Sequence, residues 1–380
     1  MIARYSASFL ALSLLGASSL LTPPSAAAGE SAVAHPRAVA HAPTAAQPPT
    51  SGQQQWVLPR TPDGRPDLQG NWSNATITPM QRPRGQGPVL TRDEVVAIEG
   101  RREELIEDAS AASDPDRGAP PVGGREFDGN VLDVGTGTYN YVYIDGGDRV
   151  AIYNDEPRSS IVTHPADGRI PSLTPEAQQR RAERREFNSQ FGDYDHPENL
   201  GLPLRCLMSF GSNAGPPMLP NYFYNNNYTI VQTPDHIMIM TEMVHDVRII
   251  RMGERVPLPE HIRPWMGDSW GHWEGDTLVI ETTNLPPKQL NGTSFIYPGG
   301  SEEMRVIERL TRVSERTINY EFTVIDPATY TGEWGGEVPM RALDGLIYEY
   351  ACHEGNYALG NILSGARYQE RLEAEEPAGR

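Results

Sequence analysis

The second half of the chain repeats a pattern of short apolar segments separated by turn residues. In residues 317–325, large apolar side chains occupy every second position and polar side chains fill the positions between. Such alternation places one face of a strand against a core and the other in water. Similar segments cover residues 228–232, 237–243, 245–252, 277–283, 304–313, 317–325 and 346–353. Their regular spacing predicts a mainly β fold, with an antiparallel meander forming a barrel or a sandwich.

Two helices and long loops are expected before this meander. Thr91 and Glu94 have the spacing of a capping box, which predicts a helix from about residue 92 to 108. Thr174 before Pro175 predicts a second helix, which ends near Asn188 and whose charged residues indicate a solvated face. We therefore expect a helix- and loop-rich part over residues 56–227, a barrel part over 228–370 and a disordered tail over 371–380.

The first 28 residues have the pattern of a cleavable secretory signal. Arg4 precedes an apolar stretch from Phe9 to Leu21, and a run of small residues ends at Ala28. The stretch is shorter than the ~20 residues that span a bilayer, and no later segment is long and apolar enough to insert. Residues 29–55 have the composition of a disordered linker. We expect a periplasmic or secreted protein that does not insert into the membrane after signal cleavage.

Cys206 and Cys352 are the only cysteines in the chain. An even pair in an exported protein favours a disulfide. A disulfide-bonded Cys352 can act neither as a nucleophile nor as a metal ligand.

Charge and motifs narrow the classes of partner and cofactor. The formal net charge is −18, whereas binding to nucleic acid needs clustered positive charge. The chain has no phosphate-binding loop, no dinucleotide-binding glycine pattern and no zinc-ligand spacing, so we expect no cofactor and no motif-encoded metal site. A metal site assembled from distant histidines remains open; the candidates are His164, His196, His245 and His353.

A polar cluster interrupts apolar sequence at Glu242, His245, Asp246 and Arg248. In an extended strand Glu242, Asp246 and Arg248 share one face, and a bulge would bring His245 onto it. One interpretation is an internal ion pair between Arg248 and an acid. The other is a catalytic set in a barrel cavity, in which Arg248 orients a substrate and Glu242 or Asp246 is the general base.

Aromatic residues lie beside acids farther along the chain and suggest a substrate platform. Aromatic rings can stack on sugars, and carboxylates can serve glycosidic chemistry. Turn formation and packing within the loops explain the same residues without a ligand. The candidate substrate-binding residues of this block are Trp265, Asp268, His272 and Trp273. Two further candidates are Tyr224, in the tyrosine- and asparagine-rich loop over residues 221–228, and His353, which follows Cys352.

Several sequence blocks resemble a large family of exported bacterial proteins of uncharacterised function. These blocks are Asp67 to Trp72, Trp265 to Ser269, Gly271 to Val279 and Ala351 to Asn356. The resemblance spans most of the mature chain and implies no catalytic residues. The triplet Gly70-Asn71-Trp72 is also similar to the G-x-W opening of lipocalin-like barrels, which implies a lipocalin-like barrel. The chain departs from that pattern by a long insert between the triplet and the meander.

Three functions are consistent with these features. The first is an exported, cofactor-independent lyase, isomerase or hydrolase that acts on a small carbohydrate or aromatic compound. The second is a periplasmic protein that binds a small molecule without catalysis. The third is an interaction module of the cell envelope. A perturbed carboxyl or histidine in an open cavity is typical of the enzyme, whereas a large exposed apolar patch is typical of the envelope module.

Overall fold

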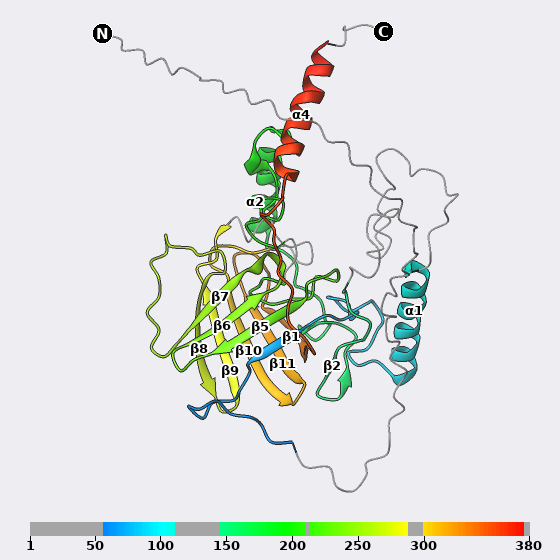
Figure 1. Ribbon diagram of the computed structural model, residues 1–380, viewed down its shortest axis with the longest axis vertical. Coiled ribbons are helices and arrows are strands. Elements are labelled where there is room, and N and C mark those ends of the chain that lie inside the picture. The colour runs from blue at the N-terminus through cyan, green and yellow to red at the C-terminus, as the bar shows by residue number, and fades with distance from the viewer. Residues whose placement is uncertain (1–55, 111–144, 210–212, 288–298, 376–380) are drawn as a thin grey trace, which may run out of the picture. The chain divides into compact units, whose positions relative to one another are not determined.

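A closed β-barrel forms the centre of the protein. The computed structural model describes residues 56–110, 145–209, 213–287 and 299–375. Neighbouring strands around the barrel follow the order β1, β5, β6, β7, β8, β9, β10, β11 and β12, and β12 pairs back to β1 (Figure 1). Their bounds are β1 Gly70–Ser73, β5 Asn227–Gln232, β6 His236–Thr241, β7 Val247–Met252, β8 Asp268–Glu274, β9 Thr277–Thr283, β10 Arg305–Ser314, β11 Thr317–Ile325 and β12 Trp334–Ala342. The prediction of a mainly β barrel with long loops is confirmed.

One pair of neighbours departs from the expected antiparallel meander. β7 and β8 are parallel, with Ile250 beside Ser269, whereas the other neighbouring pairs in the barrel are antiparallel. Residues 253–267 form the long connection that a parallel pair needs, because a tight turn can join only antiparallel strands. This parallel pair also allows a barrel with an odd number of strands to close.

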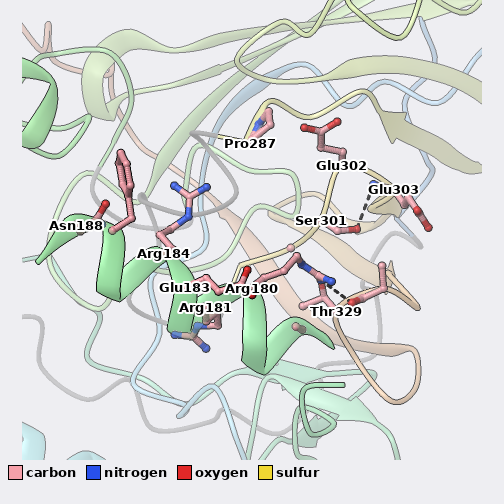
Figure 2. Close-up of a pocket in the computed structure, with 14 residues that line it drawn as sticks. Arg180, Arg181, Glu183, Arg184, Asn188, Pro287, Ser301, Glu302, Glu303 and Thr329 are labelled. Atoms are coloured by element: carbon pink, nitrogen blue, oxygen red, sulfur yellow. Dashed lines mark hydrogen bonds between the residues drawn. The ribbon is translucent and has the colours of Figure 1, made fainter. Parts of the chain in front are cut away.

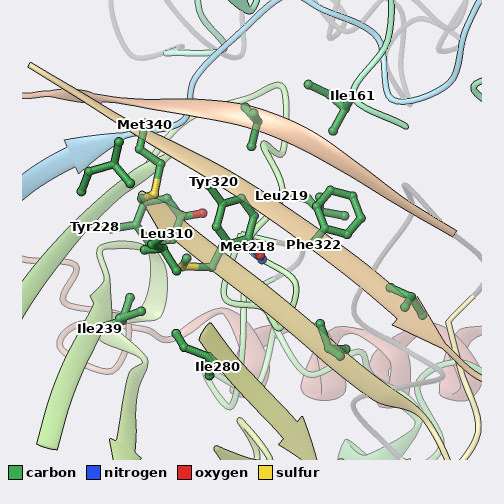
Figure 3. Close-up of a cluster of buried hydrophobic side chains, with 14 of the residues drawn as sticks. Ile161, Met218, Leu219, Tyr228, Ile239, Ile280, Leu310, Tyr320, Phe322 and Met340 are labelled. Atoms are coloured by element: carbon green, nitrogen blue, oxygen red, sulfur yellow. The ribbon is translucent and has the colours of Figure 1, made fainter. Parts of the chain in front are cut away.

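The barrel interior is filled by apolar side chains. On β11, Ile318, Tyr320, Phe322 and Val324 are all buried and point inward, as the alternation predicts. Figure 3 shows side chains from different strands converging, with Met218 from a loop among them. The loop therefore supplies part of the core, and the barrel is packed with protein side chains.

Shorter elements surround the barrel. β2 (Ile152–Tyr153) and β3 (Glu156–Pro157) form a small separate sheet, and β4 (Val162–His164) adds to the edge of β12. The approach of β4 requires glycine at 336, because a Cβ there would lie 2.1 Å from the carbonyl oxygen of Ile161. The helices are α1 (Arg92–Ser110), α2 (Pro175–Asn188) and α4 (Ala358–Glu375), and η2 (Pro197–Asn199) and η3 (Met243–His245) are 3₁₀ turns.

Both predicted helix starts are confirmed. The Thr91 Oγ1 accepts from the Glu94 amide at 3.3 Å, and the Glu94 carboxylate accepts from the Thr91 amide at 2.7 Å. The Thr174 hydroxyl accepts from the Ala177 amide at 3.1 Å at the start of α2. These contacts satisfy amides that have no partner within a first helical turn.

Three expectations for the second half are wrong. Residues 346–353 are not a strand, and the last barrel strand is β12 instead. The strand expected over 237–243 ends at Thr241, because η3 turns the chain before β7. Helix α4 includes residues 371–375, which were assigned to a disordered tail, while the signal and the linker lie outside the described residues.

The predicted disulfide between Cys206 and Cys352 is present. It joins the loop before β5 to the irregular segment that precedes α4. The chain outside the barrel at residues 343–357 is otherwise held by hydrogen bonds, and its Leu346 and Tyr348 side chains are 89% and 85% exposed. Besides the backbone that follows β12, the disulfide is therefore a second covalent attachment of the C-terminal segment to the rest of the structure.

We expect loss of the disulfide in a Cys206→Ser/Cys352→Ser variant to open this segment locally. For a loop of this length, chain entropy limits the stabilisation by the disulfide to roughly 5 kcal/mol of unfolding free energy. Few buried contacts in this segment depend on the bond. Hydrogen exchange should rise sharply in residues 346–375 and stay slow in β9 to β12. Equal loss of protection in the barrel strands would contradict this prediction.

Candidate functional site

The predicted catalytic cluster does not form one site. Glu242 precedes η3, and its carboxylate accepts from the Asn227 amide group at 2.6 Å and from the Tyr348 backbone amide at 3.2 Å. His245 lies 2.9 Å from the Tyr350 carbonyl oxygen through its Nδ1. Both side chains therefore hold the C-terminal segment against the end of the barrel.

The connection between β6 and β7 has an unusual backbone. Val244 and His245 have φ values of 61° and 48°, in the left-handed region that β-branched residues in particular avoid. This turn, together with the start of β7 at Val247, breaks the single extended strand that would have aligned the cluster. The structure thus explains why Glu242, His245 and Arg248 have different surroundings.

Arg248 points into the barrel and pairs with Glu308 of β10. The guanidinium is bidentate, with Nη2 2.9 Å from Glu308 Oε1 and Nη1 close to Oε2, and the residues are 2% and 0% exposed. The Tyr320 hydroxyl donates to Glu308 Oε1 at 2.8 Å and accepts from the Met218 amide at 2.7 Å. The internal ion pair expected as one of two alternatives is therefore present. Its acid is Glu308, which the sequence cluster did not include.

The Asp246 carboxylate is incompletely satisfied. Its Oδ2 is buried and has no hydrogen-bond partner among the described residues, as is also true of Arg248 Nε. Burial raises the pKa of Asp246 to about 7, while a backbone hydrogen bond from Ser209 and the nearby His245 act in the opposite direction. Asp246 is thus a carboxyl group whose ionisation equilibrium is moved by burial to near neutral pH.

The aromatic and acidic block is dispersed. Asp268 is buried, pairs with Arg251 and accepts from the Leu258 amide at 2.9 Å, while Arg251 stacks 4.2 Å above the Trp270 ring. His272 is exposed and lies 3.2 Å from Glu274. These contacts stabilise the outer wall of β8, so Asp268 and His272 do not face a common ligand space.

The remaining predicted ligand residues lie apart from one another. Trp273 packs against the barrel core, and Trp265 packs against a second apolar cluster that contains Leu202 and Met208. The Tyr224 ring meets Phe223 edge-on at 5.8 Å, and His353 is exposed in a turn. Within the described residues no group of three His, Cys, Asp or Glu side chains is arranged to hold a metal ion.

A cleft of about 730 Å³ lies between α2 and the end of the barrel (Figure 2). One wall is α2, and the other is made by the residues before β10 and after β11. The residues that line the cleft include Arg181, Arg184, Phe187, Asn188, Glu302 and Glu303. The sequence pattern identified this helix only as a solvated face, because the second wall comes from more than a hundred residues away.

The barrel fixes the start of α2 firmly. The Thr174 amide donates to the Thr329 carbonyl at 2.9 Å, and the Thr174 hydroxyl donates to the Ala328 carbonyl at 3.1 Å. Arg180 donates to the same Ala328 carbonyl at 2.7 Å. The first turn of α2 is therefore anchored to the β11–β12 connection, and the later turns project along the cleft.

Arg181 and Arg184 are the available cations of this wall. Both are exposed, and neither forms a hydrogen bond or an ion pair with another described residue. Phe187, one turn beyond Arg184, is 59% exposed and contacts Phe191 with ring centroids 5.2 Å apart. The wall thus offers guanidinium groups beside an aromatic surface in a chain of strongly negative net charge.

Comparison with family models, characterised proteins and solved structures gave no match to this chain. The two sequence resemblances therefore stay predictions. None of the helices in the described residues is long and apolar enough to cross a membrane.

We expect single substitutions of the buried ion pair to be far more damaging than removal of both charges. Glu308→Gln leaves Arg248 without a counter-charge and should cost about 3–5 kcal/mol of unfolding free energy. The double variant Arg248→Met/Glu308→Leu should recover most of that loss. Urea unfolding measures both, with Arg309→Gln, which removes a partly exposed ion pair with Glu274, as control. Equal loss in the single and double variants would show that the pair is required for more than charge balance.

Asp246 makes stability depend on pH. Its folded-state pKa of about 7 lies above the ordinary 3.8, so the unfolded chain loses this proton first and stability falls as pH rises between these values. At pH 8 the free energy of unfolding of Asp246→Asn should therefore exceed that of the parent by on the order of 2 kcal/mol, as measured by urea unfolding. At pH 4 the two proteins should be equally stable. The exposed Asp193→Asn variant is the control, and an unchanged pH profile in Asp246→Asn argues against the assignment.

Proposed function

We propose that the protein is an exported small-molecule-binding protein that holds a polar organic anion in the cleft beside α2. The observation that carries the proposal is the pair Arg181 and Arg184, which line a cleft of about 730 Å³ and form no hydrogen bond or ion pair with another described residue. Ligand sites are typically clefts of about 300–1,000 Å³ with a small number of polar anchors. A guanidinium is well suited to bind a carboxylate, because two N–H groups can donate to its two oxygens.

The net charge of the whole chain also favours the α2 cleft as the place where an anion binds. At a formal net charge of −18 the surface repels small anions in general. A helix wall with unpartnered arginines is a local exception to that field. An anion that reaches the protein should therefore bind on this wall in preference to the rest of the surface.

Binding without catalysis is favoured over the enzyme hypothesis by the placement of the candidate groups. Glu242 and His245 contact the C-terminal segment, and Arg248 is neutralised by Glu308 inside the barrel. Asp246 has a raised pKa but does not line the cleft. An enzymatic function would now rest on Asp246 alone, which is the reason that it ranks second.

Export is the remaining component of the proposal. The signal-like N-terminus predicts it, and the Cys206–Cys352 disulfide is compatible with an oxidising compartment. The proposed setting is therefore the periplasm or the extracellular medium.

The proposal predicts that Arg184→Met weakens anion binding selectively. Titration calorimetry at low salt with glucuronate, benzoate and the free carboxylates of short peptides should detect binding of at least one. Loss of one exposed charge-assisted contact should weaken that binding roughly tenfold, about 1.4 kcal/mol. Arg185→Met is the matched control, because Arg185 lies on the same helix but does not line the cleft.

Two outcomes would contradict the proposal. In one, none of these anions binds to the folded protein. In the other, Arg184→Met and Arg185→Met weaken binding equally, which would indicate only the general charge of the helix.

A further inference from the structure

The two walls of the α2 cleft carry opposite net charges, because the arginines on the helix wall outnumber its one lining acid, Glu183. Arg181 and Arg184 lie on the helix, and Glu302 and Glu303 lie on the facing loop before β10. Figure 2 shows Arg184 reaching into the space from α2, with Glu302 on the other side of the cleft. A ligand in this cleft therefore meets cations at one end and carboxylates at the other.

These opposite charges do not neutralise one another across the cleft. In the described residues no arginine of α2 is within 4.0 Å of Glu302 or Glu303, and Glu302 instead pairs with Arg263 at 3.3 Å. The Glu303 carboxylate has no ion pair with a described residue. Among the described residues, Arg181 and Arg184 on one wall and Glu303 on the other therefore remain available, so a dipolar ligand could contact both walls.

From these features we infer that the ligand is a short peptide with free termini. This inference rests on the proposed binding function and specifies its ligand class. The C-terminal carboxylate lies against Arg184, and the N-terminal ammonium lies against Glu302 and Glu303.

The placement of the charges on two different walls favours a peptide over a free amino acid. In an amino acid the ammonium and carboxylate share one carbon atom, whereas each added residue of an extended chain separates them by a further ~3.5 Å. A cleft of about 730 Å³ also has room for more than one residue. Two or three residues fit both the charge pattern and the space better than one.

The uncharged lining suits the middle of a peptide. Asn188 contributes a side-chain amide, which can donate to a peptide carbonyl and accept from a peptide N–H. Phe187, 59% exposed, offers a surface on which an apolar peptide side chain can pack. A sugar acid would use the arginine wall but would leave Glu303 without a cation among the described residues.

The test uses one tripeptide in three forms. Alanyl-phenylalanyl-alanine is compared with its N-acetylated form and its C-terminal amide, by titration calorimetry with the full mature protein at low salt. We expect the free tripeptide to bind best and each blocked form to bind about tenfold more weakly, because each has lost one of the two charges.

Protein variants then assign each charge to a wall. Arg184→Met should weaken the free and N-acetylated peptides but leave the amide unchanged. The Glu302→Gln/Glu303→Gln variant should weaken the free peptide and the amide but leave the N-acetylated peptide unchanged. Arg185→Met and Glu186→Gln, outside the cleft lining, should change none of them. Urea unfolding confirms that every variant is folded; Arg263 keeps its hydrogen bonds to the Leu285 and Glu302 carbonyls when the acids are replaced.

The outcomes separate this inference from the proposed function. Equal binding of all three peptide forms, or tighter binding of glucuronate than of the free tripeptide, overturns the peptide inference while anion binding in the cleft stands. If no peptide and no other anion binds, both the inference and the proposed function are wrong.

Discussion

The architecture depends on the closure of the barrel by the four residues of β1. This strand pairs with β5 on one side and with β12 on the other, so it removes two sheet edges at once. Trp72 fixes it in place, with its indole N–H donating to the Leu68 carbonyl at 3.0 Å and the Arg312 guanidinium 5.3 Å from its ring. Arg312 also donates to the Asp67 carbonyl at 2.8 Å. Since β1 comes from the N-terminal part, the closed barrel needs both halves of the chain.

Closure also decides what the barrel can do. The described interior is occupied by core side chains and by the loop that carries Met218, so the polar groups inside serve one another. A charged pair such as Arg248 and Glu308 needs mutual compensation there, because desolvation of an isolated charge is costly. Ligand binding is therefore better supported at the rim, where the barrel holds α2 and the loop before β10 in fixed positions.

Much of the β structure could be predicted because its pattern is local. The strands over 277–283 and 317–325 were predicted with the bounds of β9 and β11, since apolar alternation and turn residues define them. β12 escaped prediction because Gly335, Gly336 and Pro339 are uncommon in strands. At Gly336 the reason is tertiary, because the missing side chain leaves space for β4. Nothing within the segment itself reveals that requirement.

The candidate sites were less predictable because they depend on contacts between distant segments. Arg248 was recognised as buried, but its partner Glu308 is 60 residues away and is identified only by the alignment of strands across the barrel. The turn at Val244 and His245 also separated residues that an uninterrupted strand would have aligned. Similarly, an arginine-rich helix looks like a solvated surface until a second wall is known to face it. The difference in predictability between strands and sites has a physical cause. The periodicity of a segment shows which of its faces is buried, whereas a site also depends on the segment that lies opposite that face.

The charges of this protein therefore divide into two groups with different capacities. Inside the barrel, Arg248 is buried and paired with Glu308. If Arg248 bound a ligand instead, Glu308 would remain as a buried carboxylate without a counter-charge. On α2, Arg184 is exposed and has no ion pair within the part of the chain that the structure describes, so a ligand can bind it without breaking a contact seen there. Each exposed contact is weak because water and salt screen it. The proposed recognition in the cleft would accordingly combine several such contacts, and opposite net charges on two walls would provide that combination without disturbing the core.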